Sequence, residues 1–441
     1  MSKIAVIGTG YVGLVSGAML SDFGHNVICV DNDGDKIKLL EQGLIPIYEP
    51  GLEDVVARTV SVGRLNFSTD AESAIRDNEI LFIAVGTPPC EDGSADLSAV
   101  SAVAKTIGEN INGYKVVVNK STVPLGTNRK TAQVIRSELL RRGVEYDFDV
   151  VSNPEFLREG SAVYDFSHPD RVVIGAESQR AFGKMREVYR VLYIGETPFV
   201  ETTPETAEMI KYASNSFLAV KISYINEIAN LCEKVGANIK DVSKAMGMDG
   251  RISPKFLHAG PGYGGSCFPK DTKALIHEAK KQESPLSIVE AADWANANQK
   301  LRMIKKIKLG AGNLKGKVIA ILGVTFKPGT DDMRDAPSLV ILPELVKSGA
   351  RLKIFDPQGK KEGIWRLADI KDSLTWCDDE YSAVTGADVI VLLTEWNCLR
   401  NLDMERVLKL ARGRYFFDLK NIYQPDVMRS HGFSYEGVGQ R

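Results

Sequence analysis

The chain opens with a strand, a glycine-rich turn, a helix and a second strand, and this succession leaves few folds open. Ile4–Ile7 is a continuous apolar run of buried-strand length, and Gly8-Thr-Gly-Tyr-Val-Gly13 follows it directly. A helical pattern runs to about Phe23, and the run Asn26–Val30 ends at Asp31. G-x-G-x-x-G between a strand and a helix, with an acid about twenty residues on, is the fingerprint of a dinucleotide-binding βαβ unit.

The same motif indicates which dinucleotide is bound. Its glycines let main chain approach a pyrophosphate, whose charge is stabilised at the N-terminus of the following helix. Asp31 would accept hydrogen bonds from ribose hydroxyls and repel a 2′-phosphate, so we expect NAD rather than NADP. The alternative, a tight turn before a solvated aspartate, fits this context less well. The cofactor-binding candidates of this motif are Gly8, Gly10, Tyr11, Val12, Gly13 and Asp31.

Strand and helix patterns continue to alternate, which predicts a doubly wound α/β sheet. Further strands are expected at Ile80–Val85, Lys115–Asn119, Asp149–Ser152 and Arg171–Gly175. Polar segments follow three of these runs directly, and ligands of open α/β sheets bind beyond the carboxyl ends of the strands. We therefore expect three loops on the cofactor side: Gly86-Thr87-Pro88, Ser121-Thr122-Val123-Pro124 and Asn153-Pro154-Glu155.

Two carboxylates, Glu155 and Glu159, lie four residues apart in the last of these segments. On a helical turn that spacing would place both on one face, a pattern that is common on solvated helices. Their position directly after a strand and Pro154 favours a functional role over a solvated surface.

A single long helix is predicted from Pro204 to Gly236. Thirty residues at about 1.5 Å each span roughly 50 Å, which is too long for one small domain. We interpret the helix as a connection between two domains that also offers a face for dimerisation. Lys211 and Asn215, four residues apart, project from one side of it, either as surface residues or as part of a site.

A second α/β segment follows the expected linker, Gly310-Ala-Gly-Asn313 with Lys315-Gly316. It resembles half of another doubly wound sheet without a repeated G-x-G-x-x-G, and its first strand ends in a loop where Lys327 and Arg334 could clamp a diphosphate. The fold class is therefore α/β, with two Rossmann-like domains joined by a long central helix. Further strands are expected at Lys317–Val324, Arg351–Phe355, Asp388–Thr394 and Arg414–Asp418.

A glycine-rich loop, Gly260-Pro-Gly-Tyr-Gly-Gly-Ser-Cys-Phe-Pro-Lys-Asp271, carries the candidate nucleophile Cys267. Glycines permit close approach of a ligand to main chain. The predicted helix Thr272–Gln282 would place its N-terminus near Cys267, where the helix dipole favours a thiolate. A buried, inert cysteine in a tight turn is the alternative, but the glycines, Lys270 and Asp271 favour a nucleophile.

Composition excludes several classes of function. Lys plus Arg (55) nearly balances Asp plus Glu (57), so no global positive field would recruit nucleic acid or an anionic membrane. The six cysteines show no CxxC spacing, which argues against a zinc site or a disulfide framework and for reduced thiols in a cytoplasmic protein. The N-terminus enters a strand directly, without a signal peptide, and no apolar run is long enough to span a membrane.

An NAD site and a nucleophilic cysteine in one chain indicate a particular chemistry. Oxidation of an alcohol needs only a base, whereas a thiolate becomes useful when the aldehyde is held as a thiohemiacetal. A second hydride loss gives a thioester, which water hydrolyses. The combination predicts a four-electron oxidation from alcohol to carboxylate.

At this point the chain resembles the UDP-glucose/GDP-mannose dehydrogenase family. The resemblance rests on Lys211 and Asn215 and on motifs in the family's order: GTGYVG (8–13), STVPLGT (121–127), NPEFLREG (153–160), FLHAGPGYGGSCFPKD (256–271) and TFKPGTDDMR (325–334). It implies oxidation of UDP-glucose to UDP-glucuronate for polysaccharide biosynthesis, in a homodimer or a higher oligomer. The domains it implies are 1–203 for NAD, a central helical domain 204–309 with the cysteine loop and the dimer surface, and 310–441 for the UDP-sugar.

The resemblance also implies roles for single residues. The catalytic set is Cys267 as nucleophile, Lys211 and Asn215 holding the developing oxyanion, Lys211 also as a base, Asp271 orienting water or Lys211, Thr122 in the same proton network, and Glu155 or Glu159 assisting thioester hydrolysis. Further NAD contacts are Lys36, Thr87, Thr122, Glu159, Lys270 and Arg334. The substrate contacts are Glu155, Phe156, Leu157, Arg158, Glu159, Lys211, Asn215, Phe256, Leu257, His258, Ala259, Gly260, Gly264, Lys327 and, from across the dimer, Arg251. No metal is implied.

Two departures and three alternatives remain. Lys420 stands where many members carry a diphosphate-contacting arginine, and Ser253 where glycine is frequent. The alternatives are a sister enzyme acting on GDP-mannose or a UDP-N-acetylhexosamine, a two-electron hydroxyacid dehydrogenase in which Cys267 is dispensable, and an inactive NAD-binding regulatory subunit. The complete set of Cys267, Lys211, Asn215 and Asp271 argues against the last.

Overall fold

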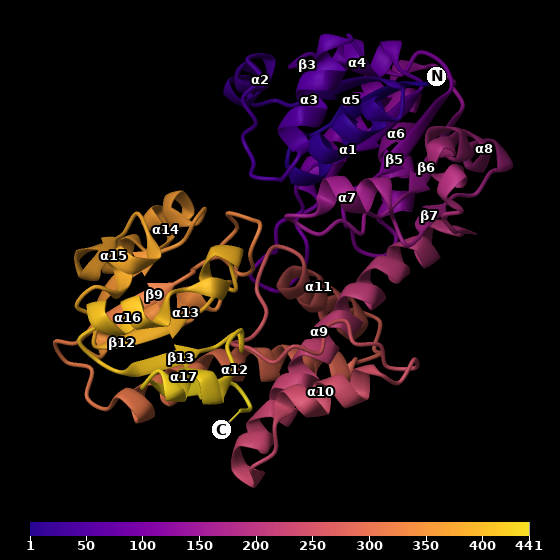
Figure 1. Ribbon diagram of the computed structural model, residues 1–441. Coiled ribbons are helices and arrows are strands. Elements are labelled where there is room, and N and C mark those ends of the chain that lie inside the picture. The colour runs from indigo at the N-terminus through magenta and orange to yellow at the C-terminus, as the bar shows by residue number, and fades with distance from the viewer. Residues whose placement is uncertain (441) are drawn as a thin grey trace. The chain divides into compact units, whose positions relative to one another are not determined.

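A computed structural model describes residues 1–440 of the chain, which form two compact units. Unit 1 comprises Met1–Ser214, and unit 2 begins at Asn215. Both are α/β units with helices on either face of a sheet (Figure 1). The long helix α9, Pro204–Val235, begins in unit 1 and ends in unit 2, as the pattern of the sequence predicted.

Unit 1 contains an eight-stranded sheet in the order β3-β2-β1-β4-β5-β6-β7-β8, in which only the β6–β7 pair is antiparallel. The order of its first strands is that of dinucleotide-binding domains, and the reversal of the strand order falls between β1 and β4. The strands are β1 (Lys3–Ile7), β2 (Asn26–Val30), β3 (Leu65–Ser68), β4 (Ile80–Ile83), β5 (Lys115–Asn119), β6 (Phe148–Ser152), β7 (Val172–Gly175) and β8 (Phe199–Thr202).

Both faces of this sheet are covered, which is why its strands are continuous apolar runs. Ile4 and Val6 of β1 pack with α1, α3, α7 and α8, whereas Ala5 and Ile7 pack with α4, α5 and α6. The helices of unit 1 are α1 (Tyr11–Asp22), α2 (Gly34–Glu41), α3 (Leu52–Ser61), α4 (Ala71–Asp77), α5 (Ser98–Asn110), α6 (Thr127–Arg142), α7 (Ala162–Ser167), α8 (Gln179–Val188) and the 3-10 turn η1 (Arg190–Gly195).

Unit 2 contains a six-stranded, fully parallel sheet in the order β11-β10-β9-β12-β13-β14. The strands are β9 (Val318–Leu322), β10 (Arg351–Phe355), β11 (Leu374–Trp376), β12 (Val389–Leu392), β13 (Tyr415–Asp418) and β14 (Ser434–Gly437). Its helices are α10 (Ile239–Gly247), α11 (Phe268–Lys281), α12 (Ser287–Ala311), α13 (Ser338–Lys347), α14 (Lys360–Arg366), α15 (Glu380–Val384), α16 (Met404–Leu410) and α17 (Pro425–Ser430), with 3-10 turns η2 (Ala368–Ser373) and η3 (Asn397–Asn401).

The turn that follows β9 in the second sheet resembles the turn that follows β1 in the first sheet, but a buried carboxylate fills its hydrogen-bonding groups. Gly323 has φ 85° and donates its N–H to Phe355 at 2.8 Å, as Gly8 (φ 102°) donates to Val30 at 2.7 Å. Asp356, at the end of β10, occupies the position that Asp31 has after β2. It is buried, and its two oxygens accept from the main-chain N–H groups of Val324, Thr325, Gln358 and Gly359, the Thr325 hydroxyl and the Trp396 indole.

The predicted fold class is confirmed, and the second sheet is complete rather than a half. The connection before the second sheet begins two residues later than expected, because α12 continues to Ala311 and a side chain at Gly310 would meet the Phe417 ring at 2.8 Å. The short edge strands β3, β8, β11 and β14 were not predicted. The boundaries proposed for three domains stay a prediction.

A buried carboxylate holds the start of α6 within unit 1. Glu208, on α9, accepts the N–H groups of Gly126 at 2.7 Å and of Asn128 at 2.8 Å. The N-cap residue of α6 is Gly126, so α6 has no capping side chain at its N-terminus. These groups lie among the first N–H donors of the helix, which lack intrahelical partners. Burial, outweighing these hydrogen bonds, raises the pKa of Glu208 to about 7.

We predict that the wild type becomes more stable relative to the Glu208→Gln variant as the pH falls from 8 to 5. A raised folded-state pKa means that the folded protein binds the proton more tightly, so stability is gained as the pH falls through about 7 toward the unfolded value. The gain is at most about 3 kcal/mol. Urea unfolding at a series of pH values measures it.

Glu205→Gln, one turn earlier on α9, is the matched control. Hydrogen bonding at the helix start and the contact with Arg129 lower the pKa of Glu205, so its stabilising contribution is lost at low pH and the difference between wild type and control should shrink. A Glu208→Gln difference that is constant or shrinks with falling pH would contradict the assignment.

Candidate active site

The glycine turn of unit 1 has the close approaches that a dinucleotide-binding turn requires. A Cβ on Gly13 would lie 1.9 Å from the Gly8 carbonyl oxygen, and Gly8 has φ 102°. Helix α1 begins at Tyr11 directly after this turn, so its first N–H groups are available for an anion. The predicted strand, turn and helix are confirmed.

Asp31 lies at the carboxyl end of β2, as predicted, and fixes the glycine turn. Its carboxylate accepts the Thr9 N–H at 2.8 Å and the Thr9 hydroxyl at 2.7 Å, and forms an ion pair with Lys36 at 3.2 Å. Burial would raise the pKa of Asp31, but the hydrogen bonds from Thr9, Asp33 and Lys36 outweigh it and lower the pKa below its usual value. The carboxylate is therefore ionised at neutral pH, ready for ribose hydroxyls.

Two further predicted loops of unit 1 contact each other. The Thr87 hydroxyl donates to the Thr122 carbonyl at 2.9 Å, and the neighbouring Ser121 hydroxyl donates to the Val85 carbonyl at 2.6 Å. The loops that follow β4 and β5 are thus tied together next to the point between β1 and β4 where the strand order reverses. Glycines, Asp31, Lys36, Thr87 and Thr122 together form a set of residues that fits NAD.

A buried glutamate that the sequence did not single out connects this turn to the 153–160 segment. Glu49 is 5% exposed and accepts the Gly160 N–H at 2.6 Å, the Ala162 N–H at 2.7 Å and the Tyr11 hydroxyl. The Tyr11 side chain of the fingerprint is therefore bound to the segment that carries Glu159. In the sequence, the position of Glu49 directly before Pro50 and Gly51 was the only signal that could have singled it out.

Residues 153–158 form neither helix nor strand and Glu159 lies in a turn, so Glu155 and Glu159 do not lie on one helix face. Pro154 and the Asn153 side chain, which donates to Val173, hold the main chain out of a helix. Glu155 is buried, and its carboxylate accepts from the Leu157 N–H at 2.5 Å and the Lys211 ammonium at 3.1 Å. Glu159 is half-buried, and Arg158 is exposed and paired with Asp165.

The Lys211–Glu155 pair is the most deeply buried ion pair of unit 1 in the described chain, with 4% of each side chain exposed. Lys211 also lies over the Phe156 ring, 5.2 Å from its centroid. An ammonium held this way has a fixed position, which is what a group that moves a proton or binds an oxyanion requires.

Cys267 lies at the N-cap of α11 in unit 2, closer to the helix than predicted. The helix begins at Phe268 rather than Thr272, because Pro269 suits its first turn. The Asp271 N–H donates to the Cys267 carbonyl at 2.8 Å, and Cys267 Sγ lies 3.5 Å from the Ser266 hydroxyl. The thiol is half-buried where the helix dipole favours a thiolate.

Asp271 and Asn215 form a buried pair in the same unit. The Asn215 amide donates to Asp271 Oδ2 at 2.6 Å, and the Lys270 ammonium lies 2.8 Å from Oδ1. Asp271 is 1% exposed. Four predicted residues, Asn215, Cys267, Lys270 and Asp271, are therefore brought together at the start of α11.

The glycines that precede Cys267 are needed for packing against protein. A Cβ on Gly264 would lie 2.6 Å from the Asp335 carbonyl oxygen, and Gly265, with φ 86°, lies against the Phe326 ring and donates its N–H to the Arg334 carbonyl at 2.7 Å. This refines the expectation that the glycines serve only ligand approach. It also places the 325–334 loop beside the cysteine loop.

The remaining predicted residues of unit 2 lie in different surroundings. Arg334 pairs with Asp332 at 2.8 Å and Lys420 with Glu395 at 3.0 Å. Arg251 is 90% exposed and pairs with Asp249 of its own chain. Lys327 and Phe256 are half-buried, His258 is exposed, and Leu257, Ala259 and Gly260 are buried. Arg251 is thus not brought to the cysteine loop within unit 2.

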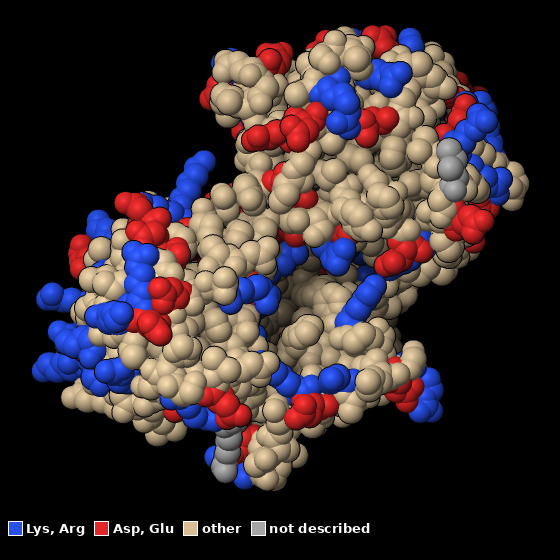
Figure 2. Space-filling view, viewed as in Figure 1, with Lys and Arg blue, Asp and Glu red and all other residues tan. Residues whose placement is uncertain are grey.

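Across residues 1–440, no group of three or more His, Cys, Asp or Glu side chains is arranged to hold a metal ion. In the same range, no helix is both long and apolar enough to cross a membrane. On the face shown in Figure 2, each unit carries acidic and basic side chains together.

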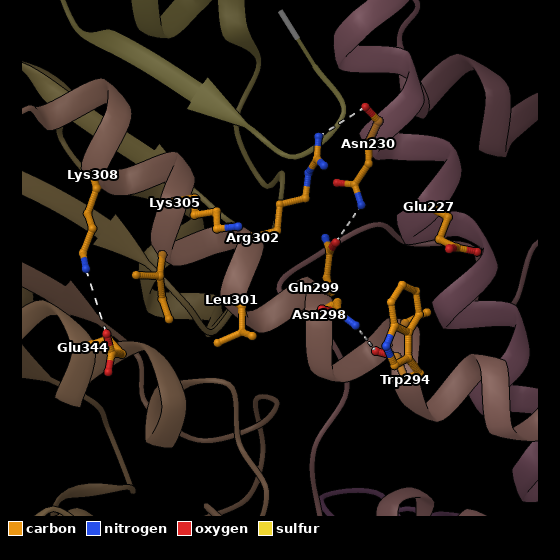
Figure 3. A pocket seen from close by; sticks show the side chains of 12 residues that line it. Glu227, Asn230, Trp294, Asn298, Gln299, Leu301, Arg302, Lys305, Lys308 and Glu344 are labelled. Atoms are coloured by element: carbon orange, nitrogen blue, oxygen red, sulfur yellow. Dashed lines mark hydrogen bonds and ion pairs between the residues drawn. The ribbon is translucent and has the colours of Figure 1, made fainter.

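A surface hollow of about 510 Å³ lies away from these residues in unit 2. Figure 3 shows side chains of α9, α12 and α13 around it, including Trp294, Leu301 and the Lys308–Glu344 pair. None of the predicted catalytic, cofactor or substrate residues lines it, so its size does not make it the active site.

Comparison with known proteins matches the chain to three family models in order. They are the NAD binding domain, the central domain and the UDP binding domain of the UDP-glucose/GDP-mannose dehydrogenase family, at residues 2–193, 205–298 and 320–425. The chain is 50% identical over 442 residues to the UDP-glucose 6-dehydrogenase of Rhizobium meliloti (strain 1021), with 99% of each chain covered.

Two solved structures are similar over nearly the whole chain. A UDP-glucose dehydrogenase from Pyrobaculum islandicum has a TM-score of 0.91 and 37% identity, covering 100% of this chain and 98% of that one. A UDP-D-ManNAc dehydrogenase from Pyrococcus horikoshii has a TM-score of 0.84 and 27% identity, covering 99% of each.

We predict that Asp31→Asn weakens NAD binding about tenfold and reduces discrimination against NADP. The neutral amide loses charge-assisted bonds to the ribose and no longer repels a 2′-phosphate. Titration calorimetry with both dinucleotides measures the two affinities. Asp35→Asn, which removes an exposed carboxylate paired with Lys38, is the control and should leave both unchanged; equal effects of the two substitutions would refute the role of Asp31.

Proposed function

Because the chain belongs to the UDP-glucose/GDP-mannose dehydrogenase family, we propose that it oxidises UDP-glucose to UDP-glucuronate with two molecules of NAD. The observation that carries this proposal is the thiol of Cys267 at the N-cap of α11, in the same unit as the buried Asn215–Asp271 pair. A dinucleotide site without a nucleophile would support only a two-electron oxidation.

The overall reaction consumes the sugar alcohol, two NAD⁺ and one water, and gives the carboxylate, two NADH and three protons. NAD, when bound, accepts a hydride in each of the two oxidation steps. In the first step the C6 hydroxyl loses its proton to a base, for which Lys211 is the candidate, and becomes an aldehyde. Cys267 then adds to the aldehyde carbon through its sulfur, forming a thiohemiacetal.

The second oxidation turns the thiohemiacetal into a thioester, and water hydrolyses that ester to release the carboxylate and the thiol. Lys211 and Asn215 are proposed to stabilise the oxyanions of these steps, and Glu155 or Glu159 to activate the water. Support comes from the fixed Lys211 ammonium beside Glu155 and from the Asn215 amide held by Asp271. Thr122 is proposed to share the proton network of Asp271, and Lys270 and Arg334 to contact NAD.

The proposed nucleotide-sugar residues lie mostly in two segments. Residues 155–159 and 256–260, with Gly264 and Lys327, are proposed to hold UDP-glucose, and Lys327 would face the diphosphate. We leave Lys420 out of this set because its ammonium pairs with Glu395 at 3.0 Å. The match of residues 320–425 to a UDP binding domain supports UDP over GDP.

The second candidate substrate is a UDP-N-acetylhexosamine. The similarity to a UDP-D-ManNAc dehydrogenase favours this alternative, but the identity of 27% is lower than the 50% shared with a UDP-glucose 6-dehydrogenase. Parallel assays with UDP-glucose, UDP-N-acetylhexosamines and GDP-mannose distinguish the substrates.

A homodimer is also part of the proposal. Phe217, Tyr224 and Leu231 recur every seven residues on α9 and are 63%, 48% and 57% exposed, and Trp294 and Leu301 repeat that spacing on α12. Such stripes need a partner helix to remove them from water. Arg251, which is 90% exposed, is available to act in a second subunit. The six free cysteines suit the reducing cytoplasm, where we place the enzyme.

We predict that each UDP-glucose consumed yields two NADH. Absorbance at a limiting amount of UDP-glucose with excess NAD measures this ratio, and chromatography identifies the product acid. One NADH per substrate would indicate a two-electron dehydrogenase instead, and no NADH with any nucleotide sugar would indicate a binding subunit.

We predict that Cys267→Ser abolishes steady-state formation of UDP-glucuronate, because a serine ester forms slowly and is hydrolysed slowly. A loss of at least about 10³-fold in kcat is expected. Mass spectrometry of the variant after incubation tests for a covalent sugar ester. Cys398→Ser, an exposed cysteine, is the control; wild-type turnover by Cys267→Ser would refute the covalent mechanism.

A further inference from the structure

A second lysine of unit 1 is buried near the Lys211–Glu155 pair and has no assigned role. Lys120 follows β5 and is 5% exposed. Its ammonium donates to the Asn153 amide oxygen at 3.1 Å and to the Tyr189 hydroxyl at 3.3 Å. It also lies 5.9 Å and 5.8 Å from the centroids of the Phe166 and Tyr189 rings. In the described chain no carboxylate lies within ion-pair distance of it.

The partners of Lys120 are themselves held in place. The Tyr189 hydroxyl donates to the Asn153 amide oxygen at 2.6 Å, and the Asn153 amide donates to the Val173 carbonyl at 2.7 Å. Asn153 begins the segment that carries Glu155. The ammonium is therefore fixed at the base of the segment whose carboxylate binds Lys211.

The charges of this cluster do not cancel. Complete burial lowers the pKa of Lys120 to about 8, the Glu155 carboxylate raises it and the Lys211 ammonium lowers it further. Glu155 and Lys211 are the charged groups that act on Lys120, while Tyr189, whose pKa burial raises, stays neutral. The cluster thus contains two lysines and one carboxylate, and only Lys211 forms an ion pair with that carboxylate.

Interaction between two titrating groups is reciprocal, so a charge on Lys120 also destabilises the charged form of Lys211. A neighbouring cation in a dry site is a known way to make a lysine a better base. Both lysines are buried, so water screens this interaction less than it would at the surface.

We propose that Lys120 is a positioning residue for the oxidation proposed above, on which this inference rests: its buried ammonium anchors the Asn153–Glu155 segment, and its charge acts on Lys211 beside the Glu155 carboxylate. The role concerns Lys211 and needs no contact between Lys120 and the substrate.

The test removes the charge of Lys120 and follows the titration of Lys211 directly. In Lys120→Met, the midpoint at which Lys211 loses its proton should rise by about one pH unit. Carbon-13 NMR of lysine labelled at Cε in the full chain, with Lys211 assigned from Lys211→Met, measures this midpoint without substrate. The ascending limb of the kcat–pH profile with UDP-glucose should shift in the same direction.

Two variants separate charge from structure. Lys120→Arg keeps a charge that does not titrate, so its Lys211 midpoint should equal or lie below that of the wild type, and this holds even if Lys120→Met does not fold. Lys115→Met removes another buried lysine of β5, whose ammonium donates to the Arg76 and Asn78 carbonyls, and should change stability without moving the Lys211 midpoint.

An unchanged Lys211 midpoint in folded Lys120→Met, or a raised one in Lys120→Arg, would overturn the inference, as would equal shifts in Lys115→Met. The proposed function fails separately, through absence of UDP-glucose oxidation by the wild type, and the NMR titration still decides the role of Lys120 in that case.

Discussion

The ion pair between Lys211 and Glu155 is the interaction on which the chemistry proposed for unit 1 depends. Both side chains are 4% exposed, and the pair joins α9 to the segment that follows β6. Such a pair adds little to stability against a well-packed apolar alternative, and breaking it leaves an unpaired buried charge. Its presence is better explained by position than by stability. Glu49 and Glu208 act similarly, each fixing main-chain N–H groups of a loop from a distant element.

The sheet of unit 1 and its nucleotide end could be predicted from the sequence because their signals are local. Ile4–Ile7, the glycine turn and Asp31 lie within one βαβ unit, where spacing alone determines the geometry. The edge strands β3 and β11 escaped prediction because they are short and half-exposed, so they lack a continuous apolar run. The start of α11 was misplaced because its first residues, Phe268 and Pro269, carry no helical periodicity, although proline is common there.

The site was predictable as a set of residues but not as an arrangement. The glycine-rich loop indicated Cys267, and the resemblance to the family supplied roles for Lys211, Asn215 and Asp271. No spacing could show that Lys211 binds Glu155 or that Asn215 binds Asp271. Lys120 was passed over because a lysine at the end of a strand is normally solvated. Only the packing of Asn153 and Tyr189 around its ammonium distinguishes it from a surface residue.

The closed turn of unit 2 limits what this half of the chain can bind. Asp356 has six donors around an anion with about four lone-pair sites, so it is saturated by its own loop. The Asp356 carboxylate therefore holds the turn of unit 2 together through its own loop rather than binding a ribose. Introducing glycines after Gly323 would not by itself create a second dinucleotide site, because the carboxylate that would bind the ribose already holds the β9 and β10 ends together.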